Sequence, residues 1–200
     1  MTDVMVVEDQ SLVRDAIATL LSLEDKIEIV AKCADGQAAL DWLANNPAPD
    51  LILSDIEMPK VSGLHLAEKL RDNCKSKFVI MTTFAKPGYI KRALQAGVAG
   101  FILKEADSEY LLNSIQSIIN GNKVIEPELA MMALEDNNPL SSKEAKALTL
   151  ASEGLTTKEV AARLFLSEGT IRNYLSEAIT KLHATNRVDA ARIAKQKGWL

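Results

Sequence analysis

The sequence predicts an α/β domain with a parallel sheet, followed by a small all-α domain, and three observations support this. Short apolar runs rich in β-branched residues alternate five times with segments of helical periodicity within residues 1–120. The runs are continuously apolar rather than alternating, as expected for strands buried on both faces. From residue 139 onward strand-like runs disappear and helical segments remain.

The elements of the first domain follow in a regular order. Strands are expected at Val4–Val7, Ile27–Ala31, Leu51–Ser54, Phe78–Thr82 and Ala99–Leu103. Helical spacing is found at Leu12–Leu23, Gly36–Asn45, Gly63–Asp72, Pro87–Ala96 and Ser108–Asn120. This alternation implies right-handed crossovers, with helices on both faces of a parallel sheet.

The second domain, residues 139–200, is expected to contain four helices. They are expected at Ser142–Ser152, Thr157–Leu164, Glu168–Leu182 and Arg187–Lys197. N-capping residues precede them: Ser141 stands three residues before Glu144 and Thr156 three before Glu159, while Ser167 and Asn186 precede the last two helices. Residues 121–138 are acidic and are expected to form a linker with one short helix.

Composition excludes several protein classes. With 48% hydrophobic and 25% charged residues in 200, the chain is neither disordered nor collagen-like. Cys33 and Cys74 stand far apart without a CxxC pattern, so neither a disulfide framework nor a zinc module is expected. The acidic N-terminus does not resemble a signal peptide, and the longest uncharged run, 110–122, is too short to span a membrane. A cytoplasmic protein without a membrane partner is expected.

Net charge differs between the two domains. Residues 1–120 hold 17 acidic and 12 basic residues, whereas residues 139–200 hold 6 acidic and 10 basic residues. The overall charge of −4 is therefore an average over an acidic and a basic domain. A basic domain is compatible with nucleic-acid binding.

Three acidic residues fall at strand ends that meet at one edge of the predicted sheet. Glu8 and Asp9 follow the first strand and Asp55 follows the third, and such strand ends line the binding crevice of open α/β sheets. Oxygen ligands of this kind suit Mg²⁺. Thr82 and Lys104 end the fourth and fifth strands, which adds a hydroxyl and an ammonium group. Together these groups could hold a tetrahedral dianion bonded to Asp55, which would be the phosphoryl acceptor.

Residues 1–120 resemble the receiver domain of bacterial two-component response regulators. The resemblance lies in Glu8-Asp9, in Asp55 followed by Met58-Pro59 and Gly63, in Thr82, and in Ala96–Phe101 with Lys104. It implies a flavodoxin-like, doubly wound five-stranded sheet of order 2-1-3-4-5 and phosphorylation of Asp55 by a histidine kinase. It also implies Mg²⁺ bound by Glu8, Asp9, Asp55 and the backbone carbonyl of Glu57.

The same resemblance assigns three further roles. Phe101 occupies the position of the switch aromatic residue and lacks the hydroxyl that tyrosine would carry there. Glu57 and Phe84 occupy the positions that influence phosphoryl lifetime. We expect Phe84 to shield the phosphoryl group, while Glu57 can interact with attacking water.

The helix expected at Glu168–Leu182 has the features of a recognition helix. Arg172 and Asn173 lie on the polar face opposite its apolar stripe, and these residue types are suited to reading guanine and adenine edges. The surrounding segment is similar to the LuxR-type domain of the NarL/FixJ regulators, notably at Glu153–Val160 and Leu166–Ile171. The similarity implies a helix-turn-helix that faces bases with Arg172, Asn173 and Ser176 and contacts the DNA backbone with Lys158, Thr170 and Lys181.

Two smaller points concern the C-terminal domain. The helix at Arg187–Lys197 matches the helix through which DNA-binding domains of this family dimerise, with simple packing of the bundle as the alternative. Within the family, the segments 82–89, 172–174 and 197–199 resemble DesR-like regulators of membrane-lipid desaturation in Gram-positive bacteria.

The expected function is control of transcription by phosphorylation-dependent dimerisation and DNA binding. The first and last receiver helices are the expected dimer face, because the segment Ser108–Asn120 has a broad apolar stripe; the fourth helix and fifth strand are the alternative. Expected partners are a histidine kinase, promoter DNA, a second copy of the chain and RNA polymerase.

Two other functions are alternatives for this sequence. A phosphatase of the haloacid-dehalogenase type would need a DxDx[TV] pattern on its first strand, which this sequence lacks. A receiver with a protein-binding adaptor in place of a DNA-binding domain would bind no duplex. We expect no enzymatic activity beyond slow self-dephosphorylation.

Overall fold

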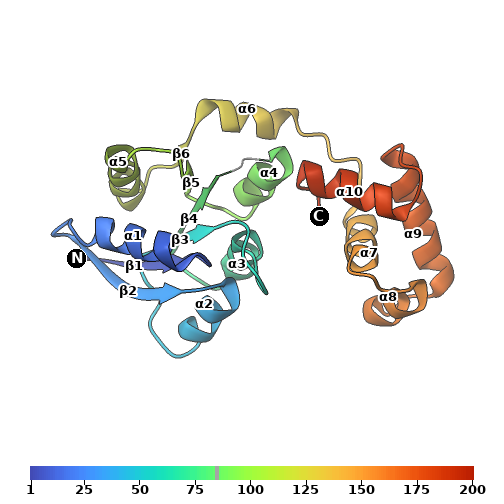
Figure 1. Cartoon of the computed structure of the whole chain (residues 1–200), viewed down its shortest axis with the longest axis horizontal. Coiled ribbons are helices and arrows are strands. Elements are labelled where there is room, and N and C mark those ends of the chain that lie inside the picture. The colour runs from blue at the N-terminus through green and yellow to red at the C-terminus, as the bar shows by residue number, and fades with distance from the viewer. Residues whose placement is uncertain (84–85) are drawn as a thin grey trace. The chain divides into compact units, whose positions relative to one another are not determined.

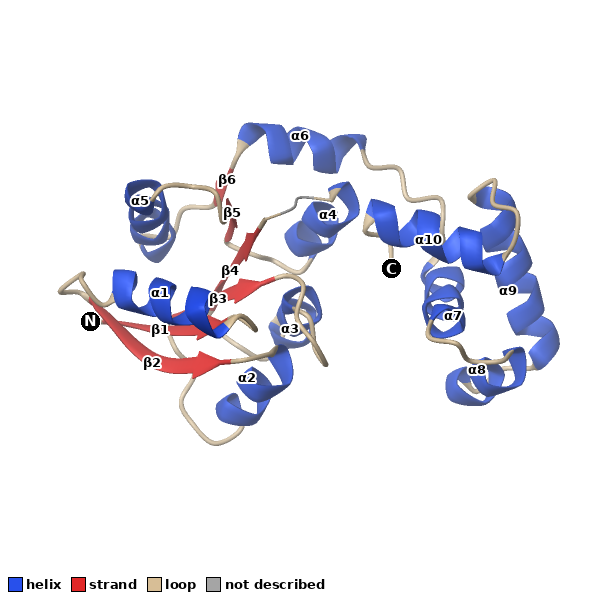
Figure 2. Ribbon diagram, viewed as in Figure 1, coloured by secondary structure: helices blue, strands red, loops and turns tan. Residues whose placement is uncertain are grey.

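A computed structural model describes residues 1–83 and 86–200 of the chain. The chain divides into two compact units. One contains most of residues 1–134, and the other contains residues 86–89 and 135–200. Figure 2 shows that the strands belong to the first unit, whereas the region after residue 140 is helical. The change from α/β to all-α that the sequence predicts is therefore confirmed.

The first unit is built on a parallel sheet of order β2-β1-β3-β4-β5-β6 (Figure 1). Its strands are β1 Thr2–Val7, β2 Ile27–Cys33, β3 Leu51–Asp55, β4 Lys77–Thr82, β5 Gly100–Leu103 and β6 Val124–Ile125. The expected order of the first five strands is confirmed. The two-residue strand β6 was not predicted; it pairs with β5 at the sheet edge and lies within the predicted linker.

Helices cover both faces of the sheet. They are α1 Ser11–Leu21, α2 Gly36–Leu43, α3 Gly63–Leu70, α4 Pro87–Gln95 and α5 Ser108–Ile119. Helices α1 and α5 share one apolar core with the strands, centred on Leu21, Leu53 and Ile115, and α2 and α3 lie on the opposite face (Figure 1). Every residue of β3 is buried, which explains why the strand begins with the apolar run Leu51–Leu53.

Strand register brings the polar strand ends to one edge of the sheet. Val7 pairs with Ser54, and Thr82 pairs with Leu103. Glu8 therefore follows β1 beside the end of β3, and Lys104 follows β5 beside the end of β4. Because all these strands are parallel, side chains from four of them can meet in one place.

The second unit contains four helices around a core that includes Leu148, Val160 and Ile171. They are α7 Ser142–Ser152, α8 Thr157–Leu164, α9 Glu168–Lys181 and α10 Arg187–Lys197. Ser141 with Glu144 and Thr156 with Glu159 form complete capping boxes at α7 and α8. These short-range patterns explain why the predicted helix starts agree with the structure.

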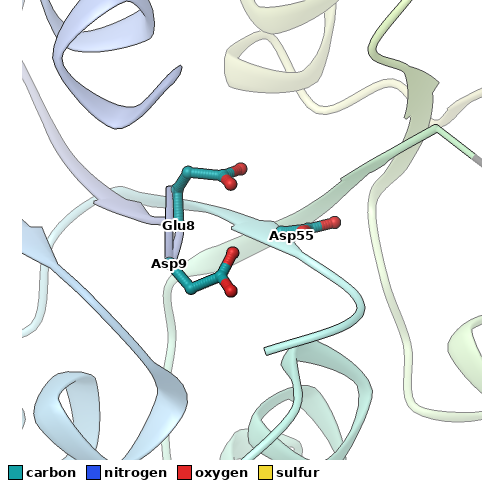
Figure 3. Close-up of side chains that lie close together, drawn as sticks. All are labelled: Glu8, Asp9 and Asp55. Carbon is teal, nitrogen blue, oxygen red and sulfur yellow. The ribbon is translucent and has the colours of Figure 1, made fainter. Parts of the chain in front are cut away.

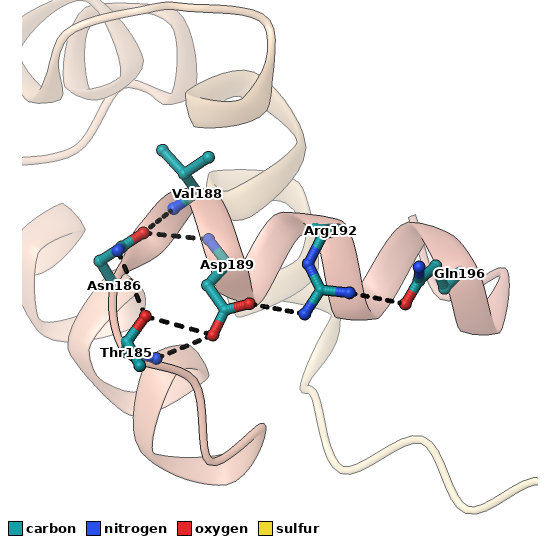
Figure 4. Close-up of polar contacts among 6 residues, drawn as sticks. All are labelled: Thr185, Asn186, Val188, Asp189, Arg192 and Gln196. Carbon is teal, nitrogen blue, oxygen red and sulfur yellow. Dashed lines mark hydrogen bonds and ion pairs between the residues drawn. The ribbon is translucent and has the colours of Figure 1, made fainter.

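The start of α10 is capped by a different arrangement, shown in Figure 4. The side chain of Asn186 accepts hydrogen bonds from the backbone N–H groups of Val188 and Asp189. The Asp189 carboxylate accepts from the backbone of Thr185 rather than from that of Asn186, and it also pairs with Arg192. The cap therefore extends one residue further back than a capping box.

Residues 121–138 contain one short helix, as predicted, and in addition a short strand. They contain β6 and the helix α6 Pro127–Glu135, in which Leu129 and Ala133 are buried while Met131 and Leu134 are exposed. None of the helices in the described residues is long and apolar enough to cross a membrane.

Candidate functional site

Three carboxylates meet at the edge of the sheet where β1 and β3 end. Figure 3 shows the side chains of Glu8, Asp9 and Asp55 extending into one region, and one oxygen from each lies within 4.8 Å of the other two. Glu8 and Asp55 are buried, whereas Asp9 is exposed. Oxygen donors at this spacing, with access from solvent through Asp9, have the chemistry of a site for a hard divalent cation.

Lys104 is the cationic member of this cluster. Its ammonium nitrogen lies 2.7 Å from Oε2 of Glu8 and 3.0 Å from Oδ2 of Asp55. Burial raises the pKa of Glu8, against the lowering effect of Lys104. Burial acts to lower the pKa of Lys104, but the bonds and charges of Glu8 and Asp55 outweigh it, so this pKa is raised. The ammonium thus compensates part of the negative charge around Asp55.

The Asp55 carboxylate is held in place on both oxygens. Oδ1 accepts a hydrogen bond from the backbone N–H of Ile56 at 2.7 Å, while Oδ2 faces Lys104. The pocket beside it has a volume of about 400 Å³. Its lining includes Asp9, Glu57, Thr82 and Lys104, together with residues outside the predicted set. A small tetrahedral group on Asp55 would be within this pocket.

The remaining predicted receiver residues have different environments. Thr82 is buried at the end of β4, and Phe101 is buried within β5. Glu57 is exposed at the pocket. Phe84 lies outside the described residues.

Arg14 was not among the predicted residues. It donates a hydrogen bond from its guanidinium to the backbone carbonyl of Glu8 and so fixes the end of β1 to α1.

The helix-turn-helix consists of α8 and α9, joined by a turn at Phe165 and Leu166. Phe165 has a left-handed backbone with a φ of 56° and is 94% exposed. Ile171 and Leu175 face the core of the unit. The residues expected to meet DNA are Lys158, Thr170, Arg172, Asn173, Ser176 and Lys181, and all are exposed except Thr170, which is half-buried.

Two of these residues already have partners within the second unit. The guanidinium of Arg172 lies 2.9 Å from the carboxylate of Glu168, one turn earlier in α9. The hydroxyl of Thr170 lies 2.9 Å from that of Ser167, the N-cap of the same helix. The Glu168–Arg172 pair was not predicted, although its i, i+4 spacing is readable from the sequence.

Lys181 also has a partner, on α7. Its ammonium lies 2.8 and 2.9 Å from the two carboxylate oxygens of Glu144. Burial acts to raise the pKa of Glu144, but hydrogen bonds from Lys181 and Ser141 outweigh it and hold this pKa below its usual value. The pair links the end of the recognition helix to the start of α7. The two residues are 37 positions apart, so no local sequence pattern predicts this ion pair.

Comparison with known protein families assigns both units. Residues 4–116 match the response regulator receiver domain, and residues 138–194 match the luxR family of bacterial regulatory proteins. The chain is 43% identical to the transcriptional regulatory protein DesR of Bacillus subtilis, covering 100% of this chain and 99% of that protein. It is 32% identical to the nitrate/nitrite response regulator protein NarP of Escherichia coli, covering 94% and 91%.

Solved structures agree with the family assignment. The response regulator ChrA of a heme-sensing two-component system is 28% identical with a TM-score of 0.56, covering 100% of this chain and 98% of ChrA. RcsB of Salmonella typhimurium, at 21% identity, shares the fold with a TM-score of 0.71 and 98% coverage of both chains. These matches do not support the alternative of a haloacid-dehalogenase phosphatase. This chain belongs to the two-component response regulators that join a receiver domain to a LuxR-type DNA-binding domain and regulate transcription.

Proposed function

We propose that a histidine kinase phosphorylates this regulator at Asp55, and that phosphorylation promotes dimerisation and sequence-specific binding to promoter DNA. The observation that carries the proposal is the convergence of Glu8, Asp9 and Lys104 on the Asp55 carboxylate. As domain limits we propose residues 1–120 for the receiver, 121–138 for the linker and 139–200 for the DNA-binding domain.

In the proposed reaction, a carboxylate oxygen of Asp55 attacks the phosphorus of a phosphohistidine. A P–O bond forms, the P–N bond breaks, and the leaving imidazole takes up a proton. Lys104, 3.0 Å from Asp55, neutralises part of the charge on the phosphoryl oxygens. The Thr82 hydroxyl at the end of β4 donates a hydrogen bond to the product, and buried Phe101 repacks when Thr82 moves.

Mg²⁺ is the cofactor that the residues fit. The carboxylates of Glu8, Asp9 and Asp55, with the backbone carbonyl of Glu57, would hold it as oxygen ligands. When bound, it supplies positive charge to the transferring phosphoryl group. Glu57, exposed at the pocket, and Phe84 are proposed to set the lifetime of the phosphoryl group, through contact with water and shielding from water respectively.

For DNA we propose that α9 enters the major groove. Arg172, Asn173 and Ser176 lie exposed on the same helix and would contact base edges, with Lys158 and Thr170 on the backbone. Lys181 could contact a phosphate only by leaving Glu144, so its contribution to DNA binding should be small. Duplex binding should weaken steeply with salt, which an adaptor domain would not show.

The proposed dimer face is formed by α1 and α5. An apolar groove of about 250 Å³ lies between them and is lined by Val13, Leu20 and Leu111 among other residues. Leu12 at the start of α1 is 82% exposed, which leaves apolar surface for a second copy to cover. The alternative dimer face of the receiver is formed by α4 and β5. In the DNA-binding domain, α10 would form the contact between the two copies.

Several further assignments belong to the same proposal. The protein would act in the cytoplasm, with RNA polymerase as a further partner at the promoter. It would catalyse no reaction beyond slow loss of its own phosphoryl group.

Duplex binding to the protein's own promoter region and to genome fragments tests the proposal, with and without acetyl phosphate. Wild type should bind specific fragments more tightly after phosphorylation, and Asp55→Ala should lose this gain. Asp41→Asn, at an exposed acidic residue on α2, is the matched control and should behave as wild type.

Sedimentation with beryllium fluoride, which mimics the phosphoryl group, should show a doubled mass. Equal affinity of wild type and Asp55→Ala under all conditions would refute phosphorylation control, and a persistent monomer would refute the dimer.

A further inference from the structure

Two loops, one of which follows Asp55 in the chain, are joined by a close backbone contact. The first leads from β2 into α2, and the second, residues 56–62, leads from β3 into α3. The N–H of Gly36 donates a hydrogen bond to the carbonyl of Val61 at 3.0 Å. A Cβ atom added at Gly36 would lie 2.5 Å from that carbonyl oxygen, so only glycine allows the loops to approach this closely.

An ion pair lies next to this backbone contact. The Asp35 side chain is 5% exposed; its Oδ1 accepts from the backbone of Ala38 as the N-cap of α2, and its Oδ2 lies 2.7 Å from the ammonium of Lys60. A buried carboxylate is unfavourable unless it is paired and hydrogen-bonded. Lys60 therefore stabilises the buried charge of Asp35 from the second loop. We call this pair the Asp35–Lys60 clasp.

The backbone of Lys60 is unusual for its residue type. Its φ is 59°, in the left-handed region where glycine is favoured and lysine is strained. Glycine at this position would remove the strain but also the ammonium group that pairs with Asp35. A strained residue that persists beside a functional site, held there by a specific partner, points to a role in that site.

The loop that Lys60 holds is also anchored to Asp55. The N–H of Gly63, where α3 begins, donates to the carbonyl of Ile56 at 3.0 Å. A Cβ atom at Gly63 would overlap the carbonyl oxygen of Asp55. The loop is thus closed at its two ends, and the clasp is a third point that fixes its middle. Glu57 lies on this loop between Asp55 and Lys60.

We propose that the Asp35–Lys60 clasp positions the loop that carries Glu57, and so sets the affinity of the acidic cluster for Mg²⁺. Both residues act as positioning residues, because neither belongs to the oxygen donors of the cluster. The inference rests on the proposed cation site. Loss of a group that orients metal ligands typically weakens metal binding about 10–100-fold. We expect about a tenfold loss when the clasp is broken.

Two substitutions break the clasp and leave the backbone contact between Gly36 and Val61 in place. Lys60→Gly removes the ammonium and relieves the left-handed strain, and Asp35→Asn removes the charge but keeps a good N-cap. Lys60→Arg keeps the positive charge and should rescue binding. Lys75→Gly, at an exposed lysine of the loop before β4, is the matched control.

Isothermal titration of the full chain with Mg²⁺ measures the effect, with thermal unfolding of the metal-free chain measured in parallel. The expected result is about tenfold weaker binding in Lys60→Gly and Asp35→Asn and near wild-type binding in Lys60→Arg and Lys75→Gly, with every metal-free variant still folded at the temperature of the titration. Binding within twofold of wild type in Lys60→Gly would overturn the inference while leaving the cation site intact. Absence of Mg²⁺ binding in wild type would instead refute the site itself.

Discussion

Replacing Lys181 by methionine separates a structural role from a DNA contact at the end of α9. The ammonium of Lys181 lies 2.8 Å from Glu144, whose side chain is only 8% exposed. Exposed ion pairs contribute about 0.2–1 kcal/mol, whereas breaking a buried pair costs about 3–5 kcal/mol. Because Lys181 is itself 35% exposed, the loss of unfolding free energy should fall between these limits, at about 2 kcal/mol.

That loss should be visible in the thermal unfolding of the DNA-binding domain. For a domain of this size, about 2 kcal/mol corresponds to a fall of about 8–16 °C in the unfolding midpoint. Scanning calorimetry of the full chain measures it. Leu148→Ala, which opens a cavity in the core of the same domain, identifies which transition belongs to it.

Lys158→Met is the matched control, because Lys158 is exposed at the start of α8. It should change the unfolding free energy by less than about 0.5 kcal/mol and lower the salt slope of DNA binding by about one. Lys181→Met should instead lower the unfolding free energy by about 2 kcal/mol and leave the salt slope of DNA binding unchanged. The reasoning would be refuted if Lys181→Met kept the wild-type midpoint and lost one unit of salt slope, since Lys181 would then be a phosphate contact.

Three further outcomes follow from the same contacts. Because the pKa of Glu144 is lowered in the folded state, its stabilisation is complete above the ordinary value of 4.5 and is lost as pH falls through the lower folded pKa. The unfolding free energy of the DNA-binding domain, measured with urea, should therefore fall less steeply between pH 6 and 3 in Glu144→Gln than in wild type. Parallel pH curves for the two proteins would contradict this. Gly63→Ala forces a methyl group against the Asp55 carbonyl and should destabilise the receiver by about 2 kcal/mol in urea unfolding; an unchanged midpoint would show that α3 can shift freely. Glu168→Ala frees Arg172 and removes a negative charge that would face DNA, so binding to non-specific duplex should tighten and its salt slope should steepen by about one. Unchanged affinity for non-specific duplex would contradict that role of Glu168.

Much of the fold was predictable because its signals are local. Apolar runs such as Val4–Val7 identify buried parallel strands, and capping pairs such as Ser141 with Glu144 identify helix starts. Parallel strands place their carboxyl ends together, so the grouping of Glu8 with Asp55 followed from strand order alone. The strand β6 could not be found in this way, because two residues carry no periodicity and its pairing depends on the exposed edge of β5.

The contacts that position the sites are mostly non-local, and no spacing rule predicts such contacts. Lys60 pairs with Asp35 across 25 residues, and Lys181 pairs with Glu144 across 37. In the sequence alone, each of these lysines has the features of a solvated surface residue. Only the fold brings a buried carboxylate within reach of each lysine, and burial makes that carboxylate unfavourable unless it is paired.

The charges around Asp55 indicate why the proposed phosphorylation would alter the site. Three carboxylates face one ammonium, so the ionised cluster has an excess of two negative charges, which a divalent cation balances. Phosphorylation replaces the single charge of Asp55 by the charge of a phosphoryl group, about −1.5 to −2. The balanced site would then hold an excess of negative charge in a partly buried position, where an uncompensated charge is unfavourable. Hydrogen-bond donors near the pocket would be drawn towards it, and the Thr82 hydroxyl, at the end of β4 in the lining of this pocket, is such a donor.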